Sequence, residues 1–241
     1  PILERWGVPR QRCAVIENWA PKGEIVPLPP TTAWAAEQGL AGTTILLYSG
    51  TLGLKHDPAG IAALARACRD RPEVRVVVVS EGVGADWLRD ARQEAGGGLD
   101  NLVLLPFQPY ARLSEVLASA AVVLAVIEPE AGIFSVPSKV LSYLSAGRAI
   151  LLAVPPENLA ARTVLGAEAG LVVAPGDTAG LIDAARRLLD DPALRDRLGG
   201  NGRAYAERTF DIAAITDRFE ALWAGPDGAA ERIVQGERWA A

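Results

Sequence analysis

Residues 44–80 of the chain read TILLYSGTLGLKHDPAGIAALARACRDRPEVRVVVVS. Two short apolar runs, 44–49 and 74–80, flank a longer amphipathic stretch, 57–70. The apolar positions of that stretch recur at helical spacing, and they include Ile61, Leu64, Ala65 and Cys68. Strand, helix and strand in this order predict a βαβ unit with parallel strands, in which Cys68 is a core residue.

The same alternation continues along the chain. The apolar runs are nearly continuous in hydrophobicity, as expected of parallel strands that helices cover on both faces. The runs are 44–49, 74–80, 102–105, 122–127, 149–154 and 171–174. Helices are expected at 57–70, 86–96, 110–119, 137–147 and 178–190. We therefore predict an α/β fold, a doubly wound parallel sheet of about six strands with helices on both faces.

The first thirty residues have a different composition. Residues 12–18 form one short strand-like run. The prolines that follow favour an extended chain of the kind found in linkers; they are Pro21, Pro27, Pro29 and Pro30. We therefore expect residues 1–30 to be a linker that precedes one domain at 31–225.

The C-terminal part of the chain lacks further strands. Beyond Pro192 the pattern is helical to about residue 223, with turns expected near 199–202 and 210–211. The last segment, 226–241, combines glycine, charges and one tryptophan. This composition fits either a docking helix or a frayed tail.

Composition and charge indicate a globular protein that does not bind nucleic acid. With 50% hydrophobic and 22% charged residues, the chain of 241 residues can bury a sizeable core. Its formal net charge of −5 gives no cationic surface field, so we expect no nucleic acid among its partners. The chain begins at Pro1 and contains no methionine, from which we expect it to be part of a longer translated product.

Cysteine and histidine are scarce. Cys13 and Cys68 cannot form a disulfide framework, and with His56 they match no zinc-ligand spacing, so no metal is expected. No signal-peptide pattern opens the chain, and its longest apolar runs are too short to span a bilayer. We therefore expect a cytoplasmic location.

Glycine-bearing turns follow the first two strands. In an open parallel sheet, ligands bind beyond the carboxyl ends of the strands. Residues 48–57, YSGTLGLKHD, contain glycines that let the backbone approach an anion and Lys55 to neutralise it. Residues 80–84, SEGVG, place two more glycines before a helix. Each turn alone also fits a plain tight turn with solvated side chains.

The loop after the fourth strand is the most unusual. Residues 128–140 read EPEAGIFSVPSKV, with two carboxylates and with Pro137 placed for the first turn of a helix. The free amides of that helix would face the same crevice as Lys55. A carboxylate there could accept hydrogen bonds from sugar hydroxyls. His56 is the one histidine, but beside Lys55 at a helix start it fits a solvated or capping group better than a catalytic base.

Several segments, in order, resemble the C-terminal half of retaining glycosyltransferases of family 4, which have the GT-B fold. They are 18–20 (NWA), 48–55 (YSGTLGLK), 80–84 (SEGVG), 102–109 (LVLLPFQP), 137–148 (PSKVLSYLSAGR), 170–177 (GLVVAPGD) and 188–195 (LLDDPALR). The helix that begins PSK is similar to that of enzymes of colanic-acid and O-antigen synthesis. The resemblance implies a Rossmann-like donor-binding domain at 31–225, after an interdomain linker at 1–30 and before a tail at 226–241.

The resemblance also implies roles for individual residues, with a UDP- or GDP-linked sugar as substrate and no further cofactor. Lys55 and Glu130 are the implied catalytic residues, and the implied donor-binding residues are Gly50, Thr51, Glu81, Gly82, Phe107, Gly132, Ser135, Ser138, Lys139 and Ser142. Lys55 and Gly50 would hold the diphosphate together with helix amides. Glu81, Gly82 and Phe107 would lie near the base. Glu130 and Gly132 would face the sugar.

The sequence departs from this family at three positions. Where the family has a pair of glutamates eight residues apart, this chain has Phe134 and Ser142, so that Glu130 would stand in for the first and a hydroxyl for the second. Thr51 replaces a frequent arginine. Two alternatives stay open: a GT-B sugar-nucleotide 2-epimerase and a non-catalytic nucleotide-sugar binding module. The resemblance further implies an N-terminal acceptor domain as partner, with peripheral membrane contact through that domain.

Overall fold

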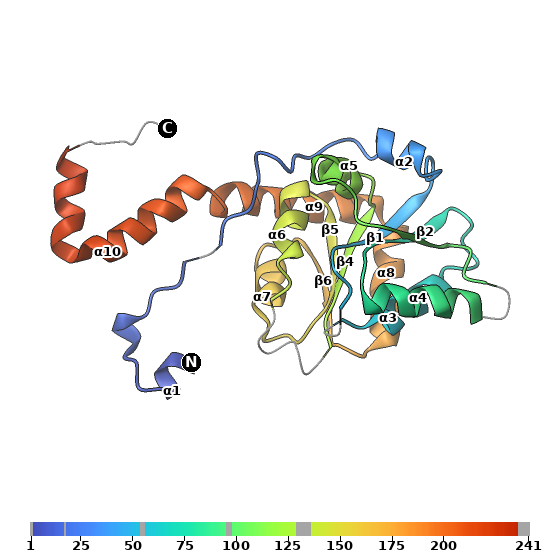
Figure 1. Cartoon of the computed structure of the whole chain (residues 1–241), viewed down its shortest axis with the longest axis horizontal. Helices are drawn as coiled ribbons and strands as arrows, with labels where there is room; N and C mark the ends of the chain where they lie inside the picture. The colour runs from blue at the N-terminus through green and yellow to red at the C-terminus, as the bar shows by residue number, and fades with distance from the viewer. Residues whose placement is uncertain (1, 17, 54–55, 95–97, 129–135, 236–241) are drawn as a thin grey trace. The chain divides into compact units, whose positions relative to one another are not determined.

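The computed structural model describes residues 2–16, 18–53, 56–94, 98–128 and 136–235 (Figure 1). Contacts between Cα atoms divide the chain into two compact units. The larger unit is Pro21–Glu207, and the smaller one joins Pro1–Ala20 to Arg208–Ala241. The larger unit contains the sheet and is described first.

The sheet has six parallel strands and confirms the predicted doubly wound fold. The strands are β1 (Thr44–Ser49), β2 (Val74–Val79), β3 (Leu102–Leu105), β4 (Val122–Val126), β5 (Ala149–Ala153) and β6 (Gly170–Val173). Their order is β3-β2-β1-β4-β5-β6. β1 pairs with β2 from Thr44 opposite Val74, and with β4 from Leu46 opposite Val122. The strand order therefore reverses between β1 and β4, which creates a crevice at their carboxyl ends.

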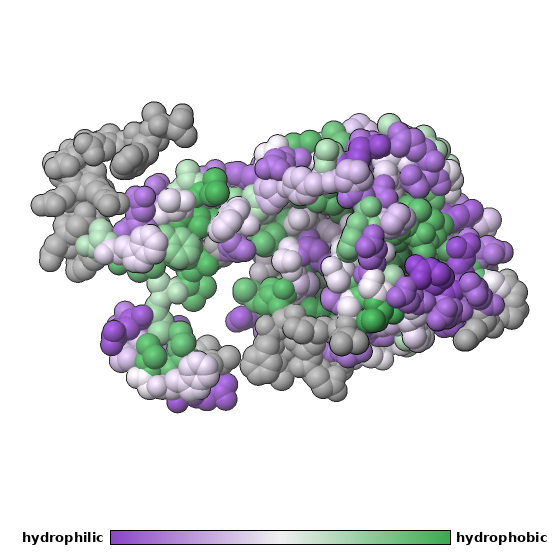
Figure 2. All heavy atoms as spheres, in the orientation of Figure 1, coloured by the Kyte–Doolittle hydropathy of each residue, from purple (hydrophilic) through white to green (hydrophobic). Residues whose placement is uncertain are grey.

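Helices cover both faces of the sheet (Figure 1). On one face α3 contacts α4 and α8, and on the other α5 contacts α2 and α6. The helices of this unit are α2 (Ala33–Glu37), α3 (Pro58–Ala67), α4 (Val83–Glu94), α5 (Leu113–Ala118), α6 (Lys139–Ala146), α7 (Leu159–Gly166), α8 (Thr178–Asp190) and most of α9 (Pro192–Thr209), with a 3-10 turn η2 at Tyr110–Arg112. The outward side of α4 is hydrophilic (Figure 2), with an ion pair between Asp86 and Arg89.

Local sequence explains where these helices begin. The Asp57 carboxylate accepts a hydrogen bond of 3.1 Å from the amide of Gly60, and Pro58 occupies the first turn of α3. Asp177 caps α8 in the same way, accepting from Gly180 at 2.8 Å. The apolar faces of α3 and α8 pack with the strands into one core, in which Cys68 is 2% exposed, as predicted.

Four sequence-based expectations about elements were wrong or incomplete. The short helices α2 and α7 were not predicted. α4 begins at Val83, three residues earlier than expected, because the Asp86 amide already makes the first helical bond, to Gly82 O at 3.1 Å. α9 continues through 199–202, where turns were expected, because Gly199 permits close packing against α6. The turn at 210–211 is confirmed, since α9 ends at Thr209 and α10 begins at Ile212.

The smaller unit contains α1 (Ile2–Arg5), a 3-10 turn η1 (Arg10–Arg12) and α10 (Ile212–Gln235). The strand-like run at 12–18 is not a strand in its described residues, and the other described residues of this unit contain no strand that could pair with its backbone. Instead, Arg218 of α10 donates to Val15 O at 2.9 Å. The last segment is helical as far as Gln235. Within the described part of the chain, no helix has the length and apolar character needed to cross a membrane.

Candidate functional site

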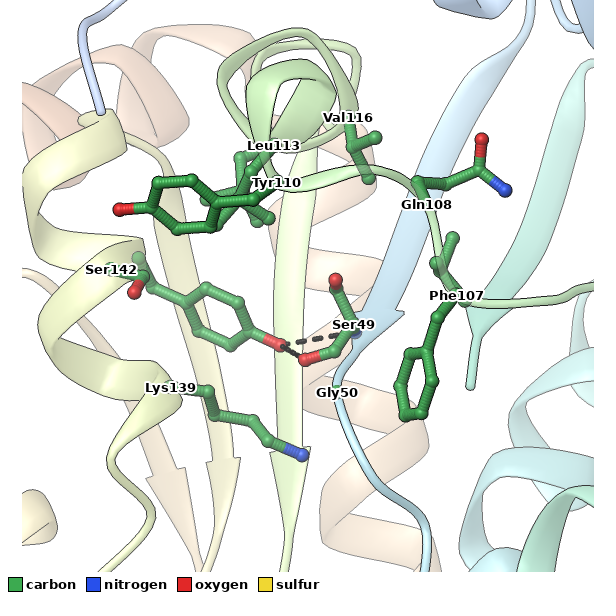
Figure 3. A pocket seen from close by; sticks show the side chains of 12 residues that line it. Ser49, Gly50, Phe107, Gln108, Tyr110, Leu113, Val116, Lys139 and Ser142 are labelled. Carbon is green, nitrogen blue, oxygen red and sulfur yellow. Dashed lines mark hydrogen bonds between the residues drawn. The ribbon is translucent and has the colours of Figure 1, made fainter. Parts of the chain in front are cut away.

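A cavity of about 250 Å³ opens at the carboxyl ends of the strands, beside the point where the strand order reverses (Figure 3). Its lining comes from the ends of β1 and β2, the loop after β3, and the helices α5 and α6. The lining residues are Ser49, Gly50, Val79, Phe107, Gln108, Tyr110, Leu113, Val116, Leu117, Lys139, Ser142 and Tyr143. This is where topology alone places a ligand in a doubly wound sheet.

One wall of the cavity is apolar. Leu113, Val116 and Leu117 come from α5 and its start. Phe107, on the loop after β3, and Tyr110, at the start of η2, add two aromatic side chains that are 45% and 56% exposed. Such exposed rings beside an apolar wall suit the flat face of a heteroaromatic group.

Hydrogen bonds hold the loop that carries these rings. The indole nitrogen of Trp34 donates to Gln108 Oε1 at 2.9 Å, and Gln108 Nε2 donates to Pro106 O at 2.9 Å. The Trp34 amide also donates to a Glu115 carboxylate oxygen at 2.9 Å. Trp34 is fully buried, so α2 ties this loop to α5.

Tyr143 joins α6 to the sheet at the floor of the cavity. Its hydroxyl accepts from the Ser49 amide at 3.2 Å and lies 3.2 Å from Ser49 O, and Figure 3 marks both contacts by dashed lines. The hydroxyl also lies 3.1 Å from Leu124 O, and it donates to one of the two carbonyl oxygens. Burial raises the pKa of Tyr143, so the phenol stays neutral. The hydroxyl therefore holds the ends of β1 and β4 and α6 in one arrangement.

Lys139 lies at the opposite end of the cavity from Leu113 and Val116 (Figure 3). Its ammonium is buried and has no hydrogen-bond partner within the described chain. Nζ lies 3.6 Å above the ring centroid of Tyr48, a cation–π contact. Burial lowers the pKa of Lys139 from 10.5 to about 7.

Gly50 provides the space for this side chain. A Cβ at position 50 would lie 3.1 Å from Lys139 Cε and 3.4 Å from Nζ, closer than side chains normally pack. Gly50 also has a φ of +128°, a conformation that residues with a side chain rarely adopt. The backbone of the first turn and the Lys139 ammonium therefore lie next to each other.

The two glycine-bearing turns are bonded to each other. The Gly84 amide donates to Leu52 O at 2.9 Å, and a Cβ at position 84 would lie 2.7 Å from that oxygen. Tyr48 Oη donates to Thr51 O at 2.8 Å, and His56 Nδ1 accepts from the Gly53 amide at 3.1 Å. His56 thus helps to close the first turn, which fits the capping role favoured from sequence.

The predicted site residues fall into three groups. Four line the cavity: Gly50, Phe107, Lys139 and Ser142. Four others are described but do not line it: Thr51, Glu81, Gly82 and Ser138. The remaining ones lie outside the described residues: Lys55, Glu130, Gly132 and Ser135.

The second group has structural contacts. Thr51 accepts the bond from Tyr48, and Gly82 has a φ of +108° in the turn that meets Leu52. Glu81 faces a separate cavity of about 160 Å³ and accepts a long, 3.4 Å bond from the Phe107 amide. Ser138 precedes α6, and its side chain caps nothing there.

Sequence reasoning missed several lining residues, among them Gln108, Tyr110 and Tyr143. For Tyr143 a signal existed. Lys139, Ser142 and Tyr143 occupy positions i, i+3 and i+4 of α6 and therefore share one helical face. The residues from α5 gave no such signal, because only the packing of α5 over the sheet brings them to the cavity.

The arrangement suits a ligand with two unlike ends. The apolar and aromatic wall would take a flat ring, and the buried ammonium would take an anion. Among the described residues, no group of three or more His, Cys, Asp or Glu side chains lies close enough to hold a metal ion.

Several known proteins are similar in sequence to this chain. A sequence profile described as "Glycosyl transferases group 1" matches residues 44–191. Glycogen synthase of Mycobacterium tuberculosis is 30% identical over 193 residues, which are 76% of this chain and 42% of that protein. The putative colanic acid biosynthesis glycosyl transferase WcaI of Escherichia coli is 28% identical over 176 residues, 73% of this chain and 42% of that protein.

Solved structures share the fold. HepE of Anabaena, in complex with UDP-glucose, has a TM-score of 0.73 and 17% identity over 90% of this chain and 58% of that one. The chain therefore spans under two thirds of the length of each of these relatives.

Proposed function

Since the chain belongs to the group 1 glycosyltransferases, we propose that it is the donor-binding domain of a retaining glycosyltransferase. Its substrate is a nucleoside diphosphate sugar, and the sugar passes to a glycan or lipid-linked acceptor. The cavity carries this proposal, because it has an apolar wall at one end and the Lys139 ammonium at the other. A nucleoside fits the wall and a diphosphate fits the cation.

The nucleoside lies against Phe107, Tyr110 and the α5 wall in this proposal. Ser142, one turn along α6 from Lys139, is within the lining and offers a hydroxyl to the ribose. The diphosphate lies toward Gly50, Lys55 and the amides near Ser135, Ser138 and Lys139. Glu130 and Gly132 face the sugar. This orientation is supported by Figure 3, where Leu113, Tyr110 and Val116 lie at one end of the cavity and Gly50 and Lys139 lie at the other.

Catalysis in this proposal is electrostatic. As the glycosidic bond loosens, negative charge builds up on the departing diphosphate. Lys55 and the free amides at the start of α6 stabilise that charge without any covalent step by the protein. No metal or further cofactor enters this mechanism.

Family 4 and the synthesis of cell-surface polysaccharide are the finer assignment that we propose. The similarity to WcaI, whose name places it in colanic acid biosynthesis, supports it. HepE was solved with UDP-glucose, which supports a UDP-linked donor, and a GDP-linked donor is the other candidate. A cytoplasmic location remains a prediction.

The acceptor is bound by a second domain in this proposal. The similar proteins are longer, and this chain matches 42% of glycogen synthase and of WcaI. The acceptor domain would also supply any peripheral contact with a membrane. We therefore expect the 241-residue chain to bind donor and to transfer sugar weakly or not at all.

Ser142 favours one of the two alternatives. Because a hydroxyl lines the cavity where the family has a carboxylate, a non-catalytic nucleotide-sugar binding module is the second candidate. The 2-epimerase reading has less support. It requires carboxylates and a histidine at the sugar, whereas His56 is bonded within the first turn and the described lining holds no carboxylate.

A thermal-shift panel tests donor binding. The chain is heated with UDP-, GDP- and dTDP-sugars, and we expect one nucleotide class to raise its Tm because a ligand that binds only the folded state stabilises it. A saturating ligand at about 100 times its Kd contributes about 2.7 kcal/mol. The matching free sugars serve as controls. An unchanged Tm with every nucleotide sugar contradicts the proposal.

A further inference from the structure

The ammonium of Lys139 has an unusual environment for a charged group. It is buried, it has no hydrogen-bond partner in the described chain, and it lies against the face of the Tyr48 ring, 3.6 Å from the centroid. The ring quadrupole attracts a cation, but it offsets only part of the free energy lost when an ammonium leaves water. An anion that enters the cavity would therefore favour the protonated form of Lys139, for which the described chain supplies no hydrogen-bond partner.

The groups that face Lys139 from the described elements carry no opposite charge. From β1, Tyr48 presents its ring, and its own hydroxyl is bonded to Thr51 O. From α6, the Tyr143 hydroxyl is bonded to β1 and β4. Burial raises the pKa of both phenols, so they stay neutral. From the first turn, His56 meets Tyr48 edge-on with ring centroids 6.2 Å apart.

We propose that the Lys139 side chain binds the donor diphosphate directly and takes up one proton from solvent as the donor binds. The proposal rests on the donor-binding function above. Nζ lies next to Gly50, at the carboxyl end of β1, where the diphosphate approaches the backbone. The diphosphate supplies the counter-charge that the described part of the cavity lining lacks.

The direction of the pH dependence follows from burial. In the free protein, burial alone lowers the pKa of Lys139 to about 7, so above this pH the amine is mainly neutral. An ion pair with the diphosphate raises its pKa in the complex. At pH values between the pKa of Lys139 in the free protein and its pKa in the complex, binding includes the uptake of a proton, and Kd rises about tenfold per pH unit. Below about pH 7 the amine is already charged, and the dependence flattens.

Titration calorimetry measures this directly. UDP-glucose is a suitable probe, or GDP-mannose if the thermal-shift panel selects guanine, since the diphosphate of a nucleotide sugar is fully ionised at neutral pH and binds no proton itself. The enthalpy of binding is measured near pH 8 in buffers with different ionisation enthalpies. We expect close to one proton taken up per donor bound, and a tenfold loss of affinity per pH unit above about 7.

Three variants assign the proton to Lys139. In Lys139→Met we expect no proton uptake, a flat pH profile and at least tenfold weaker binding at low pH. Lys22→Met, on the same unit but away from the cavity, controls for the loss of a lysine and should behave as wild type. Lys55→Gln tests the other lysine that sequence places near the diphosphate. The Tm of each unliganded variant is compared with that of wild type to confirm that it folds. An equal or higher Tm of Lys139→Met shows that this variant is folded.

The outcomes separate this inference from the proposed function. If the donor binds but no proton is taken up, or if uptake persists in Lys139→Met, the proposed role of Lys139 is wrong. The proposal that the chain binds the donor is then unaffected. Uptake that is lost only in Lys55→Gln likewise overturns the role of Lys139. If no nucleotide sugar binds at any pH, the proposed function itself is wrong.

Discussion

Lys139 and Gly50 are two residues whose roles depend on each other. The missing side chain at position 50 allows the Lys139 stem to cross the end of β1, and the positive φ of Gly50 turns the backbone there. A buried amine in such a place favours ligand binding at the expense of stability, because burial disfavours the charged form. The stability of the unliganded protein should therefore depend on the charge of Lys139.

Replacing Lys139 by methionine should stabilise the unliganded protein at neutral pH. The pKa of Lys139 is 10.5 in the unfolded chain and about 7 in the fold, so between these values the unfolded state binds more protons. The free energy of unfolding of wild type therefore rises with pH over this window, on the order of 3 kcal/mol between about pH 7 and 9.5. Urea unfolding of both proteins at the two pH values measures the difference.

Lys22→Met is the matched control for that comparison. Lys22 donates to Glu207 O and lies away from the cavity. We expect its pH dependence to equal that of wild type, while Lys139→Met lacks the rise. Parallel pH dependences in Lys139→Met and wild type would mean that Lys139 keeps an ordinary pKa.

α6 is the element that assembles the site. One face of its first turns carries Lys139, Ser142 and Tyr143, so a single helix supplies the cation, the hydroxyl and the link to β1. Its far end is held by α9, where Arg203 Nη1 donates to Ser145 O at 2.7 Å and to Ile25 O at 3.1 Å. The packing of α9 therefore supports the position of the site helix.

Neighbouring glycines in α9 provide a matched test of that packing. A Cβ at Gly199 would overlap the carbonyl oxygen of Gly147, at the end of α6, whereas a Cβ at Gly200 would meet nothing within 4 Å. Gly199→Ala should lower the free energy of unfolding by about 1–3 kcal/mol. Gly200→Ala should raise it by up to about 1 kcal/mol, because alanine favours a helix. Urea unfolding curves decide, and two variants of equal stability would contradict the close approach of α9 to α6.

Sequence predicted the strands better than the short helices for a physical reason. Strands such as Thr44–Ser49 and Leu102–Leu105 are short apolar runs that follow a polar residue and end before glycine or proline, and the bounds of both were predicted without error. α2 has five residues, which are too few for an apolar pattern of helical spacing to repeat. The tertiary contacts of Trp34 decide its conformation. The glycines of 199–202 look like turns in sequence but serve helix packing.

In the whole molecule, the strand order of the sheet determines where the cavity lies. The predicted order of strands and helices led to a crevice at the carboxyl ends of the strands, and a cavity lies there. Gly50, Phe107, Lys139 and Ser142 were predicted to bind the donor, and they line it. Tyr110 and the α5 residues were not predicted to bind the donor. Only the packing of η2 and α5 in the folded unit brings them to the cavity.

We propose above all that this cavity binds a nucleoside diphosphate sugar. A crystal structure of the chain with the nucleotide sugar selected by the thermal-shift panel tests it most directly. We expect the diphosphate to lie between Gly50 and Lys139 Nζ, with the base against Phe107 and the α5 wall. A nucleotide bound elsewhere on the chain, or bound in this cavity with its phosphates away from Lys139, would contradict it.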